Sequence, residues 1–300
     1  MLNINNILAV VDFRQSKHYA LPRAIEYAKQ FGGEITLLAN CYEGFMDFIP
    51  SSSSIDHEKI KSEAMKRNKS ELEGVIQASD HPNIKIKTEL LWSKSLHEGL
   101  SEYIKNNNFD LVVKTAHRHN PLEKLLFTPT DWHLIRDTQT NLLFVKSNQA
   151  PPNKGVLGAI NIDSDEAHNQ LNHSIVRATN LLSKTFNCKS NILNVFPWPM
   201  VQFEKFRHLF DDHDPFLTIK KAHADAVKQF VESISDYDGN LIIGEGLDAE
   251  ETIPKIAKST HSSLLVMGSV GRKGIEAAML GNTAEKILDE LECEVLVLKA

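Results

Sequence analysis

The chain has 300 residues, of which 42% are hydrophobic and 24% charged, and its formal net charge is −6 at pH 7. This composition is that of an ordinary globular protein, and the length favours two domains of roughly 150 residues each. No apolar run approaches the roughly 18 residues of a membrane span, no leader-like segment opens the chain, and no basic excess suggests nucleic acid. We therefore expect a cytoplasmic protein that contacts neither membrane nor nucleic acid.

Strands and helices are expected to alternate along the whole chain. Apolar runs predict strands in the first half at 6–13, 34–40, 84–91, 110–116 and 141–147. The same order returns in the second half, at 155–162, 190–196, 240–246, 263–269 and 294–300. Segments of helical periodicity lie between these runs, which implies right-handed crossovers and parallel sheets.

The sequence thus predicts an internal repeat, with one five-stranded α/β domain at residues 1–148 and another at 149–300. The segment 146–155 has the Pro and Asn content of a linker. The cysteines Cys41, Cys188 and Cys293 are widely spaced, which predicts thiols without disulfides.

Glycines gather after the fourth strand of the second domain. Gly268, Gly271, Gly274 and Gly281 fall within fourteen positions of a chain that has 14 glycines in all. Glycine lets a ligand approach the backbone, and a helix N-terminus presents unpaired N–H groups with the positive end of its dipole. We expect Gly268 and Gly271 to shape the turn after the strand and the following helix start to face an anion. A tight turn without any ligand is the alternative.

The first domain differs at the same place. A gapless alignment puts Thr115, Arg118 and Thr128 where the second domain has glycines. The sequence from Thr128 to Asp131 reads as an N-cap, a proline at the first helical position and an acid at the third, so the helix start is capped internally. We expect this domain to be degenerate, with side chains filling its cleft and a carboxylate at the anion's position.

The spacing Gly268-x2-Gly271-x9-Gly281 after an apolar strand resembles the ATP-binding signature of the universal stress protein family, and the whole chain is similar to its tandem two-domain members. The resemblance implies two flavodoxin-like (adenine nucleotide α-hydrolase-like) domains, each a five-stranded parallel sheet of order 3-2-1-4-5 with helices on both faces. It also implies that strands 141–147 and 293–299 pair the two domains, and it is compatible with a homodimer.

The functional implication of the resemblance is a stress-response protein that is not an enzyme and binds ATP or a related nucleotide in its second domain. The implied contact positions are Asn161, Val195, Gly268, Gly271, Arg272, Gly281, Asn282 and Thr283. Two positions depart from the family pattern. Asn282 replaces a Ser or Thr, and Asn161 replaces an Asp that the first domain keeps as Asp12.

Other functions stay open on the residues alone. The aromatic stretch 195–210 would suit an amphiphilic ligand such as a nucleotide sugar or an acyl chain if it covers the pocket, or it simply covers the sheet edge. A scaffold without any small-molecule ligand is a further alternative. The sequence contains no Gly-x-Ser-x-Gly, Walker lysine or His-Glu-x-x-His motif, so we predict no catalytic residues. Slow ATP hydrolysis stays open, as does an ATP-consuming or adenylyl-transferring enzyme on the strength of shared architecture alone.

Two groups of metal-ligating residue types occur. One comprises His117, His119, Asp131 and His133, and the other lies in residues 208–214. Zinc needs a tetrahedral convergence that spacing does not establish, so polar patches are the simpler interpretation and we assign no metal.

Overall fold

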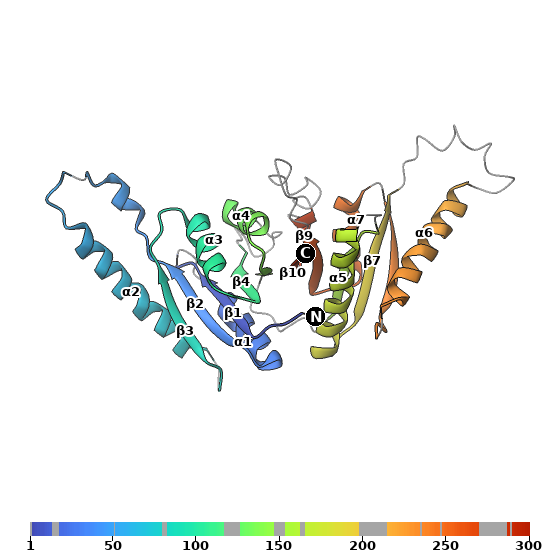
Figure 1. Ribbon diagram of the computed structural model, residues 1–300, viewed down its shortest axis with the longest axis horizontal. Coiled ribbons are helices and arrows are strands. Elements are labelled where there is room, and N and C mark those ends of the chain that lie inside the picture. The colour runs from blue at the N-terminus through green and yellow to red at the C-terminus, as the bar shows by residue number, and fades with distance from the viewer. Residues whose placement is uncertain are drawn as a thin grey trace. The chain divides into compact units, whose positions relative to one another are not determined.

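The computed structural model describes residues 2–13, 18–50, 52–79, 83–116, 127–146, 154–162, 166–197, 215–234, 236–246, 248–269, 287–288 and 290–300 (Figure 1). The chain divides into two compact units. The N-terminal half consists of residues 3–117 and 127–149, and the C-terminal half consists chiefly of residues 150–300.

The sheet of the N-terminal half is parallel, with the order β3-β2-β1-β4-β5. Its strands are β1 (Asn6–Val11), β2 (Glu34–Asn40), β3 (Ile86–Leu91), β4 (Leu111–Thr115) and β5 (Asn141–Val145). Its helices are α1 (Ala20–Phe31), the short 3-10 helix η1 (Gly44–Phe48), α2 (His57–Gln77), α3 (Leu96–Asn106) and α4 (Pro129–Asp137). Helix α1 packs on β1 and β4, and α2 packs on β2 and β3.

The C-terminal half repeats this arrangement, with the order β10-β9-β6-β7-β8. Its strands are β6 (Val156–Ile160), β7 (Ser190–Pro197), β8 (Asn240–Gly246), β9 (Leu264–Ser269) and β10 (Glu294–Lys299). The helices of its described part include α5 (Glu166–Thr185), α6 (Pro215–Glu232) and α7 (Ala249–Ser259). Counted along the chain of each half, both sheets have the order 3-2-1-4-5, which confirms the predicted repeat and fold.

The register of the sheets makes the two halves comparable residue by residue. Ile7 lies opposite Leu111 in the first sheet, and Val156 lies opposite Leu264 in the second. Counting forward from these pairs, Asp12 and Asn161 occupy equivalent positions just beyond the first strand of each sheet. The family resemblance implied this equivalence.

The burial pattern of each strand fits its position in the sheet. Residues Ile7 to Val11 of β1 are all buried, as expected for a central parallel strand that is covered on both faces. Strand β3 lies at the edge of its sheet and begins with alternating exposed and half-buried residues. The three cysteines, all in the described part, carry no disulfide, as predicted.

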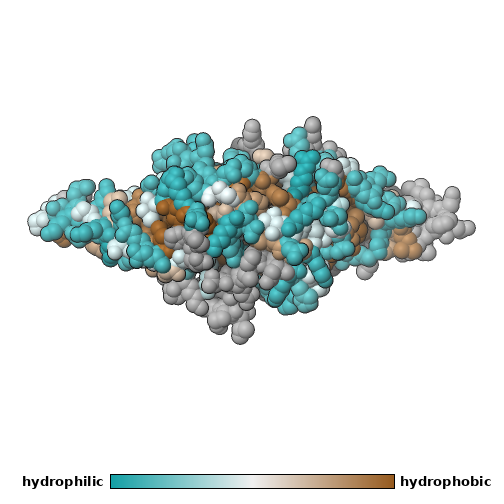
Figure 2. Space-filling model, turned by 90° about the horizontal axis from the view of Figure 1, so that it is seen from below, coloured by the Kyte–Doolittle hydropathy of each residue, from teal (hydrophilic) through white to brown (hydrophobic). Residues whose placement is uncertain are grey.

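Hydrophilic residues cover most of the molecular face in Figure 2, and hydrophobic ones come through in smaller patches. Among the helices of the described residues, none combines the length and the apolar character that crossing a membrane requires.

One surface group gives a pH-dependent prediction. Lys85 and Lys87 donate hydrogen bonds to Glu34 at 2.6 and 2.8 Å, and these bonds lower the pKa of Glu34 from 4.5 to about 2. Because the folded pKa is depressed, Glu34 favours the folded state above pH 4.5, and this contribution is lost as the pH falls toward about 2. An NMR titration should give a Glu34 midpoint near 2, and Glu34→Gln should lose less stability than wild type on acidification. A midpoint at 4.5 would contradict the assignment.

Candidate functional site

Three of the predicted contact positions lie at the carboxyl edge of the C-terminal sheet. Asn161 follows β6, Val195 lies in β7 and Gly268 lies near the end of β9. These strands are neighbours in the order β9-β6-β7, and the chain leaves β6 on one side and returns to its other side in β9. Ligands of open α/β sheets bind in the crevice at such a switch point.

The remaining predicted contacts lie outside the described residues, so their roles stay predictions. They are Gly271, Arg272, Gly281, Asn282 and Thr283. The aromatic stretch beyond residue 197 and the acidic cluster at 208–214 also lie outside them.

The structure corrects the role expected for Gly268. Strand β9 runs on to Ser269, and Gly268 pairs with Leu298 of β10, so Gly268 does not form the turn. A Cβ at this position would overlap the side chain of Leu171 in α5, with Leu171 Cγ only 2.6 Å away. Glycine is therefore required here because α5 packs closely on β9, which the sequence pattern did not reveal.

A buried asparagine holds the backbone just after β6. Asn172 of α5 accepts a hydrogen bond from the Asn161 N–H at 3.2 Å and donates one to the Asn161 carbonyl at 2.6 Å. These bonds use only the backbone of Asn161, and the residue is exposed.

A second buried asparagine lies beside Val195. Asn194 donates to the Ile160 carbonyl at 3.1 Å, and its Oδ1 lies 2.6 Å from His223 Nε2. Burial lowers the pKa of His223, which favours a neutral ring that donates this hydrogen bond. Sequence reasoning missed both asparagines because their partners lie on other elements of the fold.

The helix tip of the N-terminal half is closed in the way that the sequence predicted. Thr128 caps α4, with Pro129 at the first helical position and Asp131 completing a capping box. The Thr128 N–H donates to Asp131 Oδ2 at 2.7 Å, and the Asp131 N–H donates to Thr128 Oγ1 at 3.3 Å. The other carboxylate oxygen of Asp131 lies 2.7 Å from Lys114 Nζ, and the two side chains are 0% and 5% exposed. A paired carboxylate therefore occupies the helix tip that an anion would need.

Thr115, which stands where the C-terminal half has Gly268, also has a structural role. Its Oγ1 accepts hydrogen bonds from the N–H groups of Tyr19 and Ala20, at 3.2 and 3.1 Å. Helix α1 has no side-chain cap of its own, so Thr115 satisfies its first amides from the end of β4.

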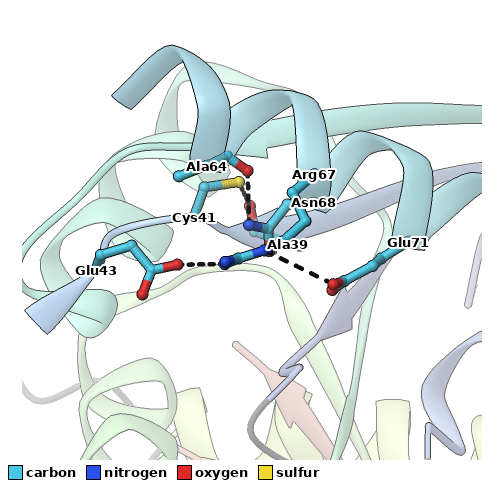
Figure 3. A network of polar contacts seen from close by, with 7 residues as sticks. All are labelled: Ala39, Cys41, Glu43, Ala64, Arg67, Asn68 and Glu71. Atoms are coloured by element: carbon cyan, nitrogen blue, oxygen red, sulfur yellow. Dashed lines mark hydrogen bonds and ion pairs between the residues drawn. The ribbon is translucent and has the colours of Figure 1, made fainter. Parts of the chain in front are cut away.

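Beside the closed helix tip, the N-terminal half holds a cavity of about 630 Å³ at the carboxyl ends of β1, β2 and β4. The expectation that side chains fill this cleft is wrong for the described residues, which leave this cavity open. Figure 3 shows one wall, where Arg67 of α2 lies between Glu43 and Glu71, with its Nε 3.7 Å from Glu71 Oε1. On another wall, Lys94 Nζ lies 2.8 Å from Asp47 Oδ1, and the Tyr42 hydroxyl donates to Asp47 at 2.6 Å.

Comparison with known proteins decides the family. The sequence profile of the universal stress protein family matches residues 3–146 and 154–299. The chain belongs to the universal stress protein family. It is 29% identical over 301 residues to universal stress protein E of Escherichia coli K12, a match that covers 100% of this chain and 95% of that protein. A homologue from Haemophilus influenzae is 27% identical over 305 residues, with 99% and 98% covered.

Solved structures agree with this universal stress protein fold. A putative universal stress protein from Pseudomonas aeruginosa UCBPP-PA14 matches with a TM-score of 0.72 and 26% identity, covering 99% of this chain and 93% of that one. A universal stress protein from Archaeoglobus fulgidus shares the fold at 14% identity, with a TM-score of 0.68 and 98% of each chain covered.

The structure describes the surroundings of three residues of this universal stress protein that carry reactive or metal-ligating groups, namely Cys41, Asp131 and His133. Burial raises the pKa of the Cys41 thiol to about 11, so this cavity residue stays protonated. His133 stacks on His97 with 3.9 Å between ring centroids, whereas Asp131 is buried against Lys114, so these two members of the predicted histidine cluster do not converge. The other two members, at 117 and 119, lie outside the described residues. Within the described part, no group of three or more His, Cys, Asp or Glu could hold a metal.

Proposed function

We propose that this protein is a cytoplasmic, non-catalytic stress-response protein whose C-terminal half binds ATP or a related phosphate-bearing nucleotide. The observation that carries the proposal is the position of Asn161 and Gly268 at the switch point of the C-terminal sheet. The glycine-rich segment 270–283 follows β9 directly in the chain. Backbone amides at a helix start would receive the phosphates there. Ligand binding would then shift the conformation of the protein or its affinity for a partner.

The contrast between the halves supports this choice of site. In the N-terminal half, Thr128 and Asp131 satisfy the amides at the tip of α4, and Lys114 neutralises the carboxylate. The C-terminal sequence has Gly281 at the position equivalent to Thr128 and Ala284 at the position equivalent to Asp131. A phosphate at this helix start would therefore meet no carboxylate at the position equivalent to Asp131.

Calorimetry with ATP, ADP and a nucleotide sugar tests the proposal. The variant Gly271→Arg copies the residue of the N-terminal half, and we expect it to weaken binding at least about tenfold because the side chain fills the space of the phosphates. The matched control is Gly74→Arg in α2, where an added Cβ meets nothing within 4 Å. It should bind like wild type. Equal binding by wild type and Gly271→Arg, or no binding by wild type, would contradict the proposal.

A scaffold that binds another protein is the second candidate. Phe45 and Phe48 of η1 are 51% and 86% exposed, and exposed aromatic side chains are frequent in protein interfaces. Native mass spectrometry of the freshly purified protein separates the candidates. A co-purified mass of nucleotide size supports the ligand-binding function, whereas a bare chain that also gives no calorimetric signal supports the scaffold.

A further inference from the structure

We propose that three side chains of the C-terminal half position the nucleotide site by fixing the backbone at the end of β6. They are Asn172 of α5, Asn194 of β7 and His223 of α6. The peptide that they fix joins Ile160 to Asn161. This inference rests on the proposed function of the C-terminal half and deepens it, since the three side chains act on the ligand only through the backbone.

The peptide between Ile160 and Asn161 is held at both of its polar groups. Its carbonyl accepts a hydrogen bond from Asn194 Nδ2 at 3.1 Å, and its N–H donates to Asn172 Oδ1 at 3.2 Å. Asn172 also donates to the next carbonyl, that of Asn161, at 2.6 Å. The peptide planes on both sides of Asn161 are thereby held, which fixes the direction of its Cα–Cβ bond.

Both asparagines are shielded from water. Asn194 is 1% exposed and Asn172 is 4% exposed. Water therefore cannot take over the hydrogen bonds to the backbone if one of these side chains turns away. A buried group that loses its partner is costly, so each asparagine favours one orientation of the peptide strongly over the others.

His223 extends this clamp to α6. Its Nε2 lies 2.6 Å from Asn194 Oδ1, and it donates to this oxygen because the Nδ2 of Asn194 is turned to the Ile160 carbonyl. The imidazole packs on Phe196, with 4.9 Å between ring centroids, and α6 contacts β7 (Figure 1). His223 therefore holds the amide of Asn194 in the orientation that the bond to the Ile160 carbonyl requires.

The N-terminal half shows that the fold does not need this clamp. Asn194 lies opposite Ile160 in the C-terminal sheet, and the equivalent pair of the N-terminal sheet is Ala39 and Val11. Ala39 is buried and has no polar side-chain group that could hold a carbonyl. Burying an amide costs free energy that an apolar side chain avoids. The amide occurs in the half whose sequence keeps the glycine-rich segment, which links it to ligand binding rather than to the fold.

Calorimetry with ATP on the full chain tests the positioning role. Asn194→Leu removes the bond to the Ile160 carbonyl and should weaken ATP binding at least about tenfold, because the site is no longer preorganised. His223→Leu frees the amide of Asn194 and should weaken binding at least about threefold. The double variant should bind no more weakly than Asn194→Leu alone, because His223 acts only through Asn194.

A conservative change separates positioning from packing. His223→Gln carries an N–H group the same number of bonds from its Cα as Nε2, so ATP affinity should stay within about twofold of wild type. The matched control is His173→Leu. His173 also packs on α6, with 4.8 Å between its ring centroid and that of Phe230, and its Nδ1 has no hydrogen-bond partner. It should bind ATP like wild type. Equal weakening in His223→Gln and His223→Leu would overturn the positioning role.

Hydrogen exchange of the ligand-free protein reads the clamp directly. The Asn161 amide should exchange at least about tenfold faster in Asn172→Leu and Asn194→Leu than in wild type, whereas the amides of β1 should not change. An unchanged rate at Asn161 overturns the clamp. Circular dichroism checks that each variant is folded, and the pair His223→Leu and His223→Gln still decides if Asn194→Leu does not fold.

The outcomes separate this inference from the function on which it rests. If wild type binds no ATP, the proposed function is wrong and the positioning role is overturned with it. If wild type binds ATP and folded Asn194→Leu and His223→Leu bind it as tightly, the positioning role alone is overturned.

Discussion

Replacing Asp131 by alanine is expected to lower the free energy of unfolding by about 3–5 kcal/mol, because it leaves a buried lysine without its partner. Lys114 Nζ lies 2.7 Å from Asp131, and the lysine side chain is only 5% exposed, so solvent cannot replace the lost carboxylate. The same change removes the hydrogen bonds between Asp131 and Thr128 that cap α4. Urea denaturation followed by circular dichroism measures the loss.

Two controls separate burial of the charge from charge pairing in general. Lys255 and Glu251 form an ion pair at 2.8 Å in which the two side chains are 73% and 72% exposed, so Glu251→Ala should change stability by less than about 1 kcal/mol. The double variant Lys114→Met with Asp131→Ala should regain part of the loss, because an apolar side chain tolerates burial. If Asp131→Ala loses no more free energy of unfolding than Glu251→Ala, the buried ion pair does not stabilise the fold as proposed.

Gly268→Thr, which copies the residue of the N-terminal half, is expected to destabilise the C-terminal half by about 1–3 kcal/mol through overpacking. A Cβ at position 268 would lie 2.6 Å from Leu171 Cγ, and threonine adds further atoms on a strand with little room. Thermal unfolding followed by circular dichroism detects the loss as a lower melting temperature.

The second variant Leu171→Ala relieves the overlap and should make the Gly268→Thr change less damaging, which a double-mutant cycle measures. Gly74→Thr is the matched control, because a Cβ at Gly74 meets nothing within 4 Å, and it should change stability by at most about 0.5 kcal/mol. If Gly268→Thr unfolds like wild type, the close packing of α5 on β9 is not what requires a glycine.

The parts of the fold that follow from local rules could be predicted from the sequence. Alternating apolar runs and helical segments predicted the strands and their parallel pairing, because a parallel sheet needs crossover helices. The capping box of α4 could be predicted because Thr128, Pro129 and Asp131 lie within four positions of one another. The equivalence of Asp12 and Asn161 was implied by the family resemblance, which places each residue at the end of the first strand of its half.

The structural features that the sequence did not reveal depend on contacts between residues far apart in the chain. Thr115 caps a helix whose first residue lies 95 positions earlier, and Asn194 contacts a histidine 29 positions later. The need for glycine at 268 comes from one leucine of another element. The cavity of the N-terminal half was missed for a related reason, because a closed helix tip suggested a closed cleft, although the two are built by different elements.

Photocrosslinking with an azido analogue of ATP, followed by peptide mapping, tests most directly whether the two halves differ as proposed. The label should appear within residues 154–299, should be lost when unlabelled ATP competes, and should be greatly reduced in Gly271→Arg. Specific labelling confined to residues 3–146 would contradict the assignment of the nucleotide to the C-terminal half.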